Sequence, residues 1–325
     1  MHNLPAWLNK YTDSLSKEKL HHAYLFYGRG GLGKRNLLNG IGEAILCENS
    51  KLVSCGKCKA CKLIISGNHP DLHTVQIQEG KKNLSISQII SLREKIYESS
   101  FLGQNKVISI PNIESMSRDA SDAILKILEE PPKDTFFVMS TNFIHQIPST
   151  IRSRSIELEI TTPTFNECYE WLSESYSENI NLAVELSNNR PFIARDLLDL
   201  DLLDLRSSFI KDISGIIKSG KHIVSISKQW SKELETLPLK LEWMSYILID
   251  AIKHESVTEF AEVLSDSENI TRFLGEKSDI FNLHELLKQT NEIWNLFCSD
   301  SNLRKEYQLQ SLFVAWERGL GISSQ

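Results

Sequence analysis

Residues 28–35 read G-R-G-G-L-G-K-R and follow a short apolar run, H-A-Y-L-F-Y, at residues 22–27. A phosphate-binding loop reads glycine, four residues, glycine, lysine and then serine or threonine, and it joins a strand to a helix. Gly28, Gly33 and Lys34 match this pattern, and apolar residues at helical spacing follow them. The stretch therefore predicts an α/β fold of the P-loop NTPase type.

The last position of this loop departs from the pattern. Arg35 stands where a hydroxyl would hold Mg²⁺, and an arginine side chain only donates hydrogen bonds. An ATPase of this class also needs a carboxylate pair after a buried strand, but Pro111 and Asn112 follow the apolar run at 107–110. Glu114 lies further on and is expected to face another direction. Both metal-dependent parts are missing, which predicts a chain without intrinsic ATP hydrolysis.

Nucleotide binding is a separate question from hydrolysis. Gly28, Gly33 and Lys34 could still hold a phosphate of ATP, because backbone N–H groups at a helix N-terminus attract anions. The same residues could equally persist as a structural turn. The sequence leaves both interpretations open.

Apolar runs alternate with helical patterns through the first half of the chain. Strands are predicted at 22–27, 72–77, 107–110, 135–139 and 156–160, with helices between them. Ser87 and Ser117 are candidate caps for two of these helices, and Pro131-Pro132 ends the second. Such alternation predicts a parallel sheet covered by helices on both faces.

A hinge is predicted at residues 161–163, T-T-P, because the strand patterns end there. The remainder reads as helical, with one apolar stripe formed by Met244, Ile247, Leu248, Ala251 and Ile252. We therefore expect an α/β domain at 1–162, a small helical domain at 163–206 and a larger helical domain at 207–325.

Four of the six cysteines, Cys47, Cys55, Cys58 and Cys61, have the spacing C-x7-C-x2-C-x2-C. Four thiolates satisfy a tetrahedral Zn²⁺ and leave no open position, which is the pattern of a structural site. An iron–sulfur cluster uses similar runs but usually with a proline after the last cysteine, and none follows here. Four buried thiols without a metal are the remaining alternative. The density of the cluster favours structural zinc near residues 47–61.

The composition indicates a globular protein of more than one domain. The 325 residues carry a net charge of −6, which argues against a protein that binds nucleic acid by itself. No apolar run has the length of a membrane span, and the N-terminus lacks the apolar core of a signal peptide. We expect a cytoplasmic protein without membrane contact, in which thiols stay reduced.

Two arginines lie in the stretch I-R-S-R-S at 151–155, just before the last predicted strand. At the edge of a sheet, Arg152 and Arg154 could reach a neighbouring subunit's γ-phosphate as arginine fingers. The alternative is that they form surface salt bridges, and these residues alone favour that alternative.

Several stretches together resemble the bacterial clamp-loader subunits of the AAA+ superfamily. They are H-H-A-Y-L-F-Y-G-R-G-G-L-G-K at 21–34, the four-cysteine insert, G-N-H-P-D at 67–71, A-I-L-K-I-L-E-E-P-P at 123–132, and I-R-S-R-S at 151–155. The resemblance implies an AAA+ α/β domain, a helical lid at 163–206 and an oligomerising helical collar at 207–325.

The degenerate loop and the missing acidic pair match the non-hydrolysing subunit of that family. The resemblance implies a stator in a five-subunit ring with gamma or tau and delta subunits, an accessory part of DNA polymerase III that helps load a sliding clamp onto primed DNA. It also implies that Arg154, with Ser153 beside it, acts in trans as an arginine finger, because S-R-S matches two positions of the family's Ser-Arg-Cys motif. One alternative is an ATP-hydrolysing motor subunit of the gamma or tau type. Another is a zinc-stabilised DNA-binding module.

Overall fold

The structure is a computed structural model, and it describes residues 4–13, 20–49, 54–78, 81, 83–102, 105–219, 222–256, 265–298 and 304–319. Contacts between residues divide the chain into two compact units. The first unit comprises Met1–Ser177 with Asn189–Ile193, and the second comprises Glu178–Asn188 with Ala194–Gln325. Among the described helices, none combines the length and hydropathy needed to cross a lipid bilayer.

The first unit contains a parallel sheet of five strands in the order β2-β3-β4-β1-β5. The strands are β1 (Ala23–Tyr27), β2 (Leu72–Thr74), β3 (Lys106–Ile110), β4 (Thr135–Thr141) and β5 (Ile156–Glu159). Its helices are α1 (Ala6–Asp13), α2 (Lys34–Leu46), α3 (Lys59–Ile65), α4 (Ile86–Tyr97), α5 (Arg118–Glu129), α6 (Ser149–Arg152) and α7 (Phe165–Ser173), with short 3-10 helices at Ile113–Ser115 and Ile144–Gln146. The predicted parallel α/β sheet with five strands is confirmed.

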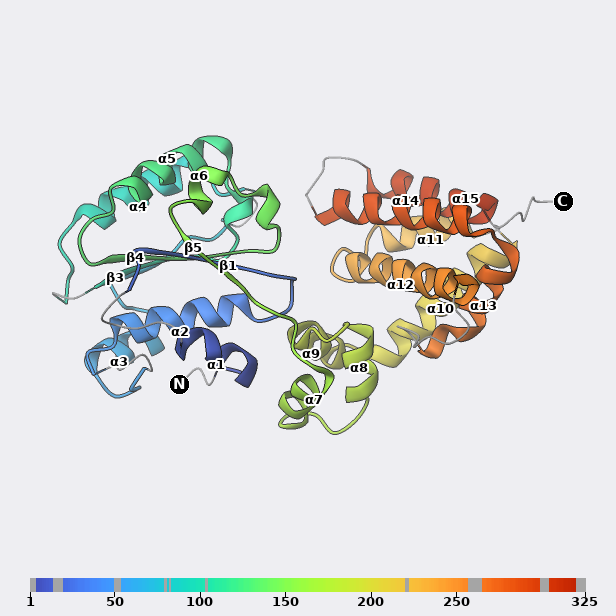
Figure 1. Cartoon of the computed structure of the whole chain (residues 1–325), viewed down its shortest axis with the longest axis horizontal. Helices are drawn as coiled ribbons and strands as arrows, with labels where there is room; N and C mark the ends of the chain where they lie inside the picture. Colours follow the sequence, from blue (N-terminus) through green and yellow to red (C-terminus); the bar gives the residue numbers. More distant parts are fainter. Residues whose placement is uncertain are drawn as a thin grey trace. The chain divides into compact units, whose positions relative to one another are not determined.

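Helices cover both faces of this sheet, as the sequence predicts. Helices α4 and α5 lie on one face, and α1, α2 and α3 lie on the other (Figure 1). Each face has its own apolar core, in which alternate strand residues meet one helix layer. Ile108 of β3, for example, belongs to the same core as Ile124 of α5, whereas Val107 belongs to the core that contains Leu37 of α2.

Helices α4 and α5 both begin at a serine N-cap. Ser117 caps α5 as predicted, because its side chain accepts a hydrogen bond from the N–H of Ala120. The prediction that Ser87 caps α4 is wrong, since Ser85 is the N-cap and forms a reciprocal capping box with Gln88. Both serines are suitable N-cap residues by type, but only Ser85 lies three residues before Gln88, as a capping box requires.

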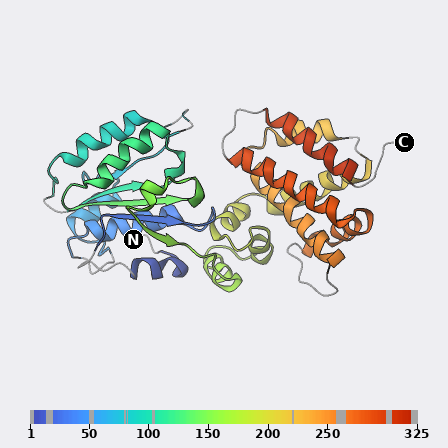
Figure 2. The same ribbon diagram turned by 45° about the horizontal axis from the view of Figure 1, so that its top comes forward.

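The second unit is helical. It holds α8 (Ile180–Leu186), α10 (Leu202–Ser219), α11 (Ile223–Trp230), α12 (Leu237–Ser256), α13 (Glu268–Lys277), α14 (Ile280–Cys298) and α15 (Lys305–Gly319), a 3-10 helix at Ser265–Ser267, and most of α9 (Pro191–Asp199). The helices from α10 onward, coloured yellow to red in Figure 2, form a bundle. Its core stacks aromatic rings: the centroids of Phe209 and Trp243 lie 5.1 Å apart, and those of Trp230 and Phe313 lie 5.2 Å apart.

Candidate functional site

Residues 28–35, which we call the phosphate-type loop, connect β1 to α2 at the carboxyl end of the sheet. Gly33 has a φ of 89°, in the left-handed region that favours glycine. A Cβ atom at Gly33 would meet Cε2 of Phe192 at 2.5 Å, and the N–H of Phe192 donates to the carbonyl of Gly31. The indole Nε1 of Trp7 donates to the carbonyl of Leu32. The loop is therefore a tightly packed turn in the protein itself.

Lys34 is buried at the start of α2, and its ammonium group points back into the loop. Its Nζ donates to the carbonyl of Gly28 at 2.7 Å and to that of Arg29 at 2.6 Å. Burial lowers the pKa of Lys34 to about 8, and the negative charge of Glu114 opposes that shift. Lys34, which would contact the phosphates of a bound nucleotide, thus donates instead to two backbone carbonyls of its own loop.

The positions that would hold Mg²⁺ carry no suitable ligand. Arg35 follows Lys34 and is exposed, and Pro111 follows the buried strand β3 at the same end of the sheet. The carbonyl of Pro111 accepts a hydrogen bond from Ser140, and Asn112 opens a 3-10 turn. Neither position offers a hydroxyl or carboxylate, and the absence of ATP hydrolysis stays a prediction.

Glu114 does not face away as expected. Its Oε1 accepts a hydrogen bond from the backbone N–H of Asn142, just after β4, at 3.0 Å. Its charge acts on Lys34 and partly opposes the lowering of the pKa of the lysine by burial. The 3-10 turn at Ile113–Ser115 redirects the side chain toward the carboxyl ends of the strands, which the spacing along the sequence did not reveal.

Arg154 lies at the opposite end of the sheet from this loop. It sits between α6 and β5, and Tyr24 near the start of β1 pairs with Ile156 at the start of β5. The loop begins only after the last residue of β1, and a strand of 5 residues is roughly 16 Å long. Arg154 is therefore placed away from the chain's own phosphate-type loop.

The two arginines of this segment have different partners. The guanidinium of Arg152 forms a bidentate ion pair with the carboxylate of Glu157, with hydrogen bonds of 2.9 and 3.0 Å. Arg154 donates to Glu129 at 2.7 Å and to the carbonyl of Thr150 at 2.8 Å, and its side chain is 33% exposed. Ser153 beside it is exposed. Both arginines are thus ion-paired and partly exposed, at 38% for the side chain of Arg152 and 33% for that of Arg154.

The four clustered cysteines come together in space. The ligand atoms of Cys47, Cys55, Cys58 and Cys61 all lie within 4.8 Å of one another. The sulfurs of Cys47 and Cys58 are 3.9 Å apart, and so are those of Cys55 and Cys61. A tetrahedral zinc with Zn–S bonds of about 2.3 Å separates its sulfurs by roughly 3.8 Å. The cluster can hold a metal ion of this kind.

Local backbone geometry builds the cysteine cluster. Cys47 ends α2 and Cys58 caps α3, so two helix ends supply ligands. Backbone N–H groups of Lys57 and Cys58 lower the pKa of Cys55 to about 6, whereas burial raises the pKa of Cys61 to about 12. A thiol such as Cys61 becomes a thiolate here only with a compensating positive charge, which a bound metal ion supplies.

Comparisons with known proteins identify the family. Residues 4–164 match the family described as DNA polymerase III, delta subunit, and residues 201–318 match DNA polymerase III, delta subunit, C terminal. The DNA polymerase III subunit delta' of Buchnera aphidicola subsp. Schizaphis graminum is 33% identical over 242 residues, which are 73% of this chain and 72% of that protein. The chain belongs to the DNA polymerase III delta' family.

Further similarities agree with this delta' assignment. The delta' subunit of Yersinia pestis is 28% identical over 273 residues, covering 80% of this chain and 79% of that protein. A gamma subunit-related protein of DNA polymerase III from Thermotoga maritima shares the fold, with a TM-score of 0.50 and 17% identity over 96% of this chain and 99% of that one. The predicted membership of the bacterial clamp-loader subunits and the AAA+ fold are confirmed.

Three further residues contribute to the sites of this delta' family member, and the sequence does not predict their roles. Glu129 forms an ion pair with Arg154, the charge of Glu114 acts on Lys34, and Phe192 packs on the loop at Gly33. Glu129 belongs to the stretch A-I-L-K-I-L-E-E-P-P at 123–132, which resembles the clamp-loader family, so the sequence already marked this segment as a candidate for function. Phe192 lies 159 positions after Gly33, so no local pattern could connect them.

Proposed function

We propose that this chain is the delta' subunit of a DNA polymerase III clamp loader and that it does not hydrolyse ATP itself. The observation that carries the second part is the pair of missing metal ligands, at Arg35 and at Pro111 with Asn112. Mg²⁺ bridges the β- and γ-phosphates in working enzymes of this class. Glu114 is a carboxylate whose charge acts on Lys34, but its Oε1 is occupied by the N–H of Asn142. Without the two usual ligands, the phosphate-type loop serves as a structural turn, supported by the packing of Phe192 and the contacts of Lys34.

The proposed contribution to catalysis is made in trans. Arg154, with Ser153 beside it, supplies a guanidinium to ATP that is bound by the adjacent motor subunit of the gamma or tau type. Its distance from the chain's own loop and its partial exposure support this role. Arginine carries a permanent positive charge, which stabilises charge on the γ-phosphate in the transition state.

The proposed setting is a five-subunit ring in the bacterial cytoplasm, with gamma or tau and delta subunits as neighbours. The complex would place a sliding clamp on primed DNA, and this chain would act as its stator. We propose an AAA+ domain at 1–162, a lid at 163–206 and a collar at 207–325, of which the collar packs against its counterparts in the ring.

We further propose that Cys47, Cys55, Cys58 and Cys61 hold one structural zinc ion. The sulfur separations suit a tetrahedral site, and four protein ligands leave no position for a substrate. The ion would fix the segment between α2 and β2 and would take no part in the chemistry of ATP.

Titration of ATP against the purified chain tests the absence of hydrolysis. We expect no turnover, and we expect any binding of ATP to be equally tight with Mg²⁺ and with EDTA. Lys34→Ala serves as the matched control, because it removes the lysine that contacts phosphate in loops of this type. Magnesium-dependent turnover that disappears in Lys34→Ala would show that the chain is a motor subunit instead.

A further inference from the structure

Strand β2 forms an open edge of the sheet. It is the outermost strand in the order β2-β3-β4-β1-β5. Its main chain faces β3 at odd-numbered residues, because the N–H of Val75 donates to Ser109 and the carbonyl of Asp71 accepts from Val107. The main-chain groups of Leu72, Thr74 and the residue after Val75 therefore face outward.

Only part of this edge is covered. The side-chain amide of Gln88 on α4 donates to the carbonyl of Gln76 at 2.8 Å, which caps the edge at that point. Within the described part of the chain, no hydrogen bond reaches the N–H or the carbonyl of Thr74. An unpaired edge of this kind is a template for another strand.

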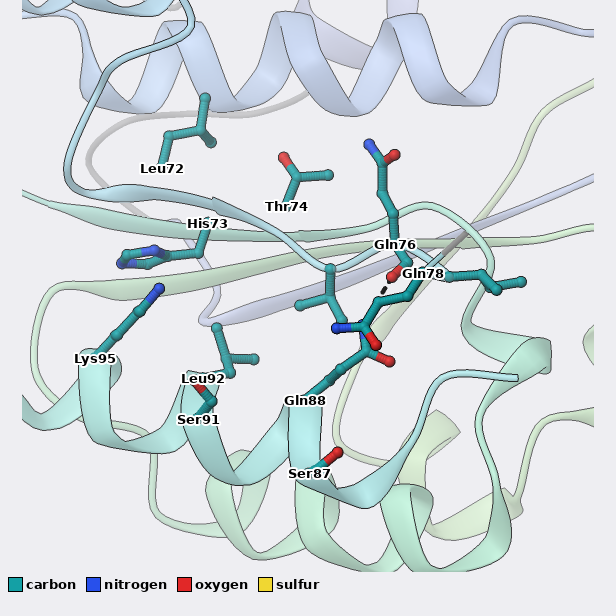
Figure 3. A pocket seen from close by; sticks show the side chains of 12 residues that line it. Leu72, His73, Thr74, Gln76, Gln78, Ser87, Gln88, Ser91, Leu92 and Lys95 are labelled. Atoms are coloured by element: carbon teal, nitrogen blue, oxygen red, sulfur yellow. Dashed lines mark hydrogen bonds between the residues drawn. The ribbon is translucent and has the colours of Figure 1, made fainter. Parts of the chain in front are cut away.

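A groove of about 660 Å³ follows the same edge. The residues of and after β2 form one wall, and Ser87, Gln88, Ser91, Leu92 and Lys95 of α4 form the other (Figure 3). Its size falls within the range of ligand sites, roughly 300–1,000 Å³. Small-molecule sites are lined mainly by apolar groups, whereas most of these side chains are polar. An extended main chain, with its regular donors and acceptors, suits such a lining better.

One end of the groove carries a lysine, Lys95, beside a histidine, His73. The ammonium group of Lys95 points toward the ring of His73 (Figure 3). Lys95 is exposed and makes no ion pair with another described residue. Burial together with the charges of Lys95 and Lys106 lowers the pKa of His73, while Asp71 and Glu98 oppose that shift. The Asp71 carboxylate is already occupied by hydrogen bonds from Ser100 and from the N–H groups of residues 101 and 102.

We infer that this groove binds an extended segment of a partner protein, which adds a strand to β2 and places an aspartate or glutamate side chain against Lys95 and His73. The N–H and carbonyl of Thr74 would pair with the main chain of the segment, as in other cases of strand addition. The acidic side chain would supply the counter-charge that Lys95 lacks.

Selection from a phage-displayed library of linear ten-residue peptides, with the full chain as bait, tests this inference. Enriched peptides are expected to share an aspartate or glutamate and to bind at least tenfold more weakly to Thr74→Pro, which removes the outward N–H. Proline is tolerated on an outward-facing edge position, so the variant should still fold. Ser91→Trp, which fills the groove and leaves the backbone unchanged, should weaken binding equally and guards against misfolding of the first variant.

The charge is tested separately on one helix. Lys95→Glu should abolish binding of the acidic peptides, whereas Arg93→Glu, the same reversal at an exposed residue of α4 outside the groove, should change it less than twofold. If the selection enriches no peptide, the inference is overturned. Lys95 would then be a charged residue that prevents edge-to-edge aggregation of the sheet. Enriched peptides that ignore Thr74→Pro, Ser91→Trp and Lys95→Glu would also overturn it.

Discussion

Arg154 and Glu129 form an ion pair with 2.7 Å between Nη2 and Oε1, although they belong to different elements of the first unit. Glu129 is the last residue of α5, and Arg154 lies in the turn before β5. The carbonyl of Thr150 accepts a second hydrogen bond from the guanidinium. These two contacts fix the direction of the Arg154 side chain. The Glu129 carboxylate also competes with any phosphate group for the guanidinium of Arg154.

Replacement of Arg154 by alanine should slow ATP hydrolysis by the assembled clamp loader. An arginine finger accelerates the reaction of its partner roughly 10³-fold or more, so we expect a loss of this order at the site that Arg154 serves. The measurement is the DNA-stimulated ATPase rate of a reconstituted complex, with assembly checked by gel filtration. Arg152→Ala is the matched control, because it removes a neighbouring arginine that is also ion-paired and is similarly exposed, at 38% against 33%. A normal rate with Arg154→Ala, or an equal loss with Arg152→Ala, would rule out the assigned role.

Neutralisation of Glu129 should have a much smaller effect. The two side chains are 33% and 51% exposed, and an ion pair of this kind contributes at most about 1 kcal/mol to stability. Glu129→Gln should therefore change the free energy of unfolding by less than about 1 kcal/mol and the ATPase rate by less than about tenfold. Urea unfolding and the reconstituted ATPase assay measure the two quantities. A loss as large as that of Arg154→Ala would mean that the ion pair itself, and not the free guanidinium, supports hydrolysis.

Local patterns in the sequence were sufficient for the sheet. Strands β1 and β4 lie in mainly apolar runs, and β3 is buried along its length, whereas β2 and β5 read L-H-T and I-E-L-E and are less apolar. Ser117 caps α5 because serine side chains satisfy free N–H groups at helix starts. The cysteine cluster was equally accessible, since its four members lie within one short segment. Both features depend on residues that are close along the chain.

The contacts that define the sites depend on residues that are distant along the chain. Phe192 packs against Gly33, and Glu129 meets Arg154 across 25 positions. Glu114 turns toward Lys34 because a 3-10 turn intervenes, and turns of this length leave little trace in apolar spacing. Only the folded chain shows which charges oppose or support one another.

Loss of one cysteine ligand should release the metal. The purified chain is expected to contain one zinc ion, and Cys58→Ser should contain none and should lose thermal stability, because metal binding stabilises the fold. Elemental analysis and thermal unfolding measure both effects. Cys168→Ser is the control, since Cys168 is a buried thiol in α7, outside the cluster. Acidification should release the ion, because protons compete for thiolates such as Cys61, whose pKa is raised to about 12. Zinc-free wild-type protein, or zinc retained in Cys58→Ser, would contradict the site.

Lys34 should make the stability of the folded chain depend on pH. Its pKa is lowered from 10.5 to about 8, so between these values the unfolded chain keeps a proton that the folded chain has released. Stability therefore rises with pH across this window, by up to about 3 kcal/mol, and the contribution is constant below pH 8. Urea unfolding at pH 7 and pH 10 should show this rise in the wild type relative to Lys34→Met. Lys133→Met, which removes a lysine with a side chain 92% exposed, should leave the rise intact.

Added ATP turns the same experiment into a test of nucleotide binding. A phosphate beside Lys34 would stabilise the charged ammonium and raise the pKa of the lysine, which would reduce the rise in stability between pH 7 and pH 10. If the loop is a structural turn, as its contacts with Phe192, Gly28 and Arg29 support, ATP should leave the rise unchanged. A flattened profile in ATP that is absent from Lys34→Met would show that the loop still holds a nucleotide, with or without hydrolysis.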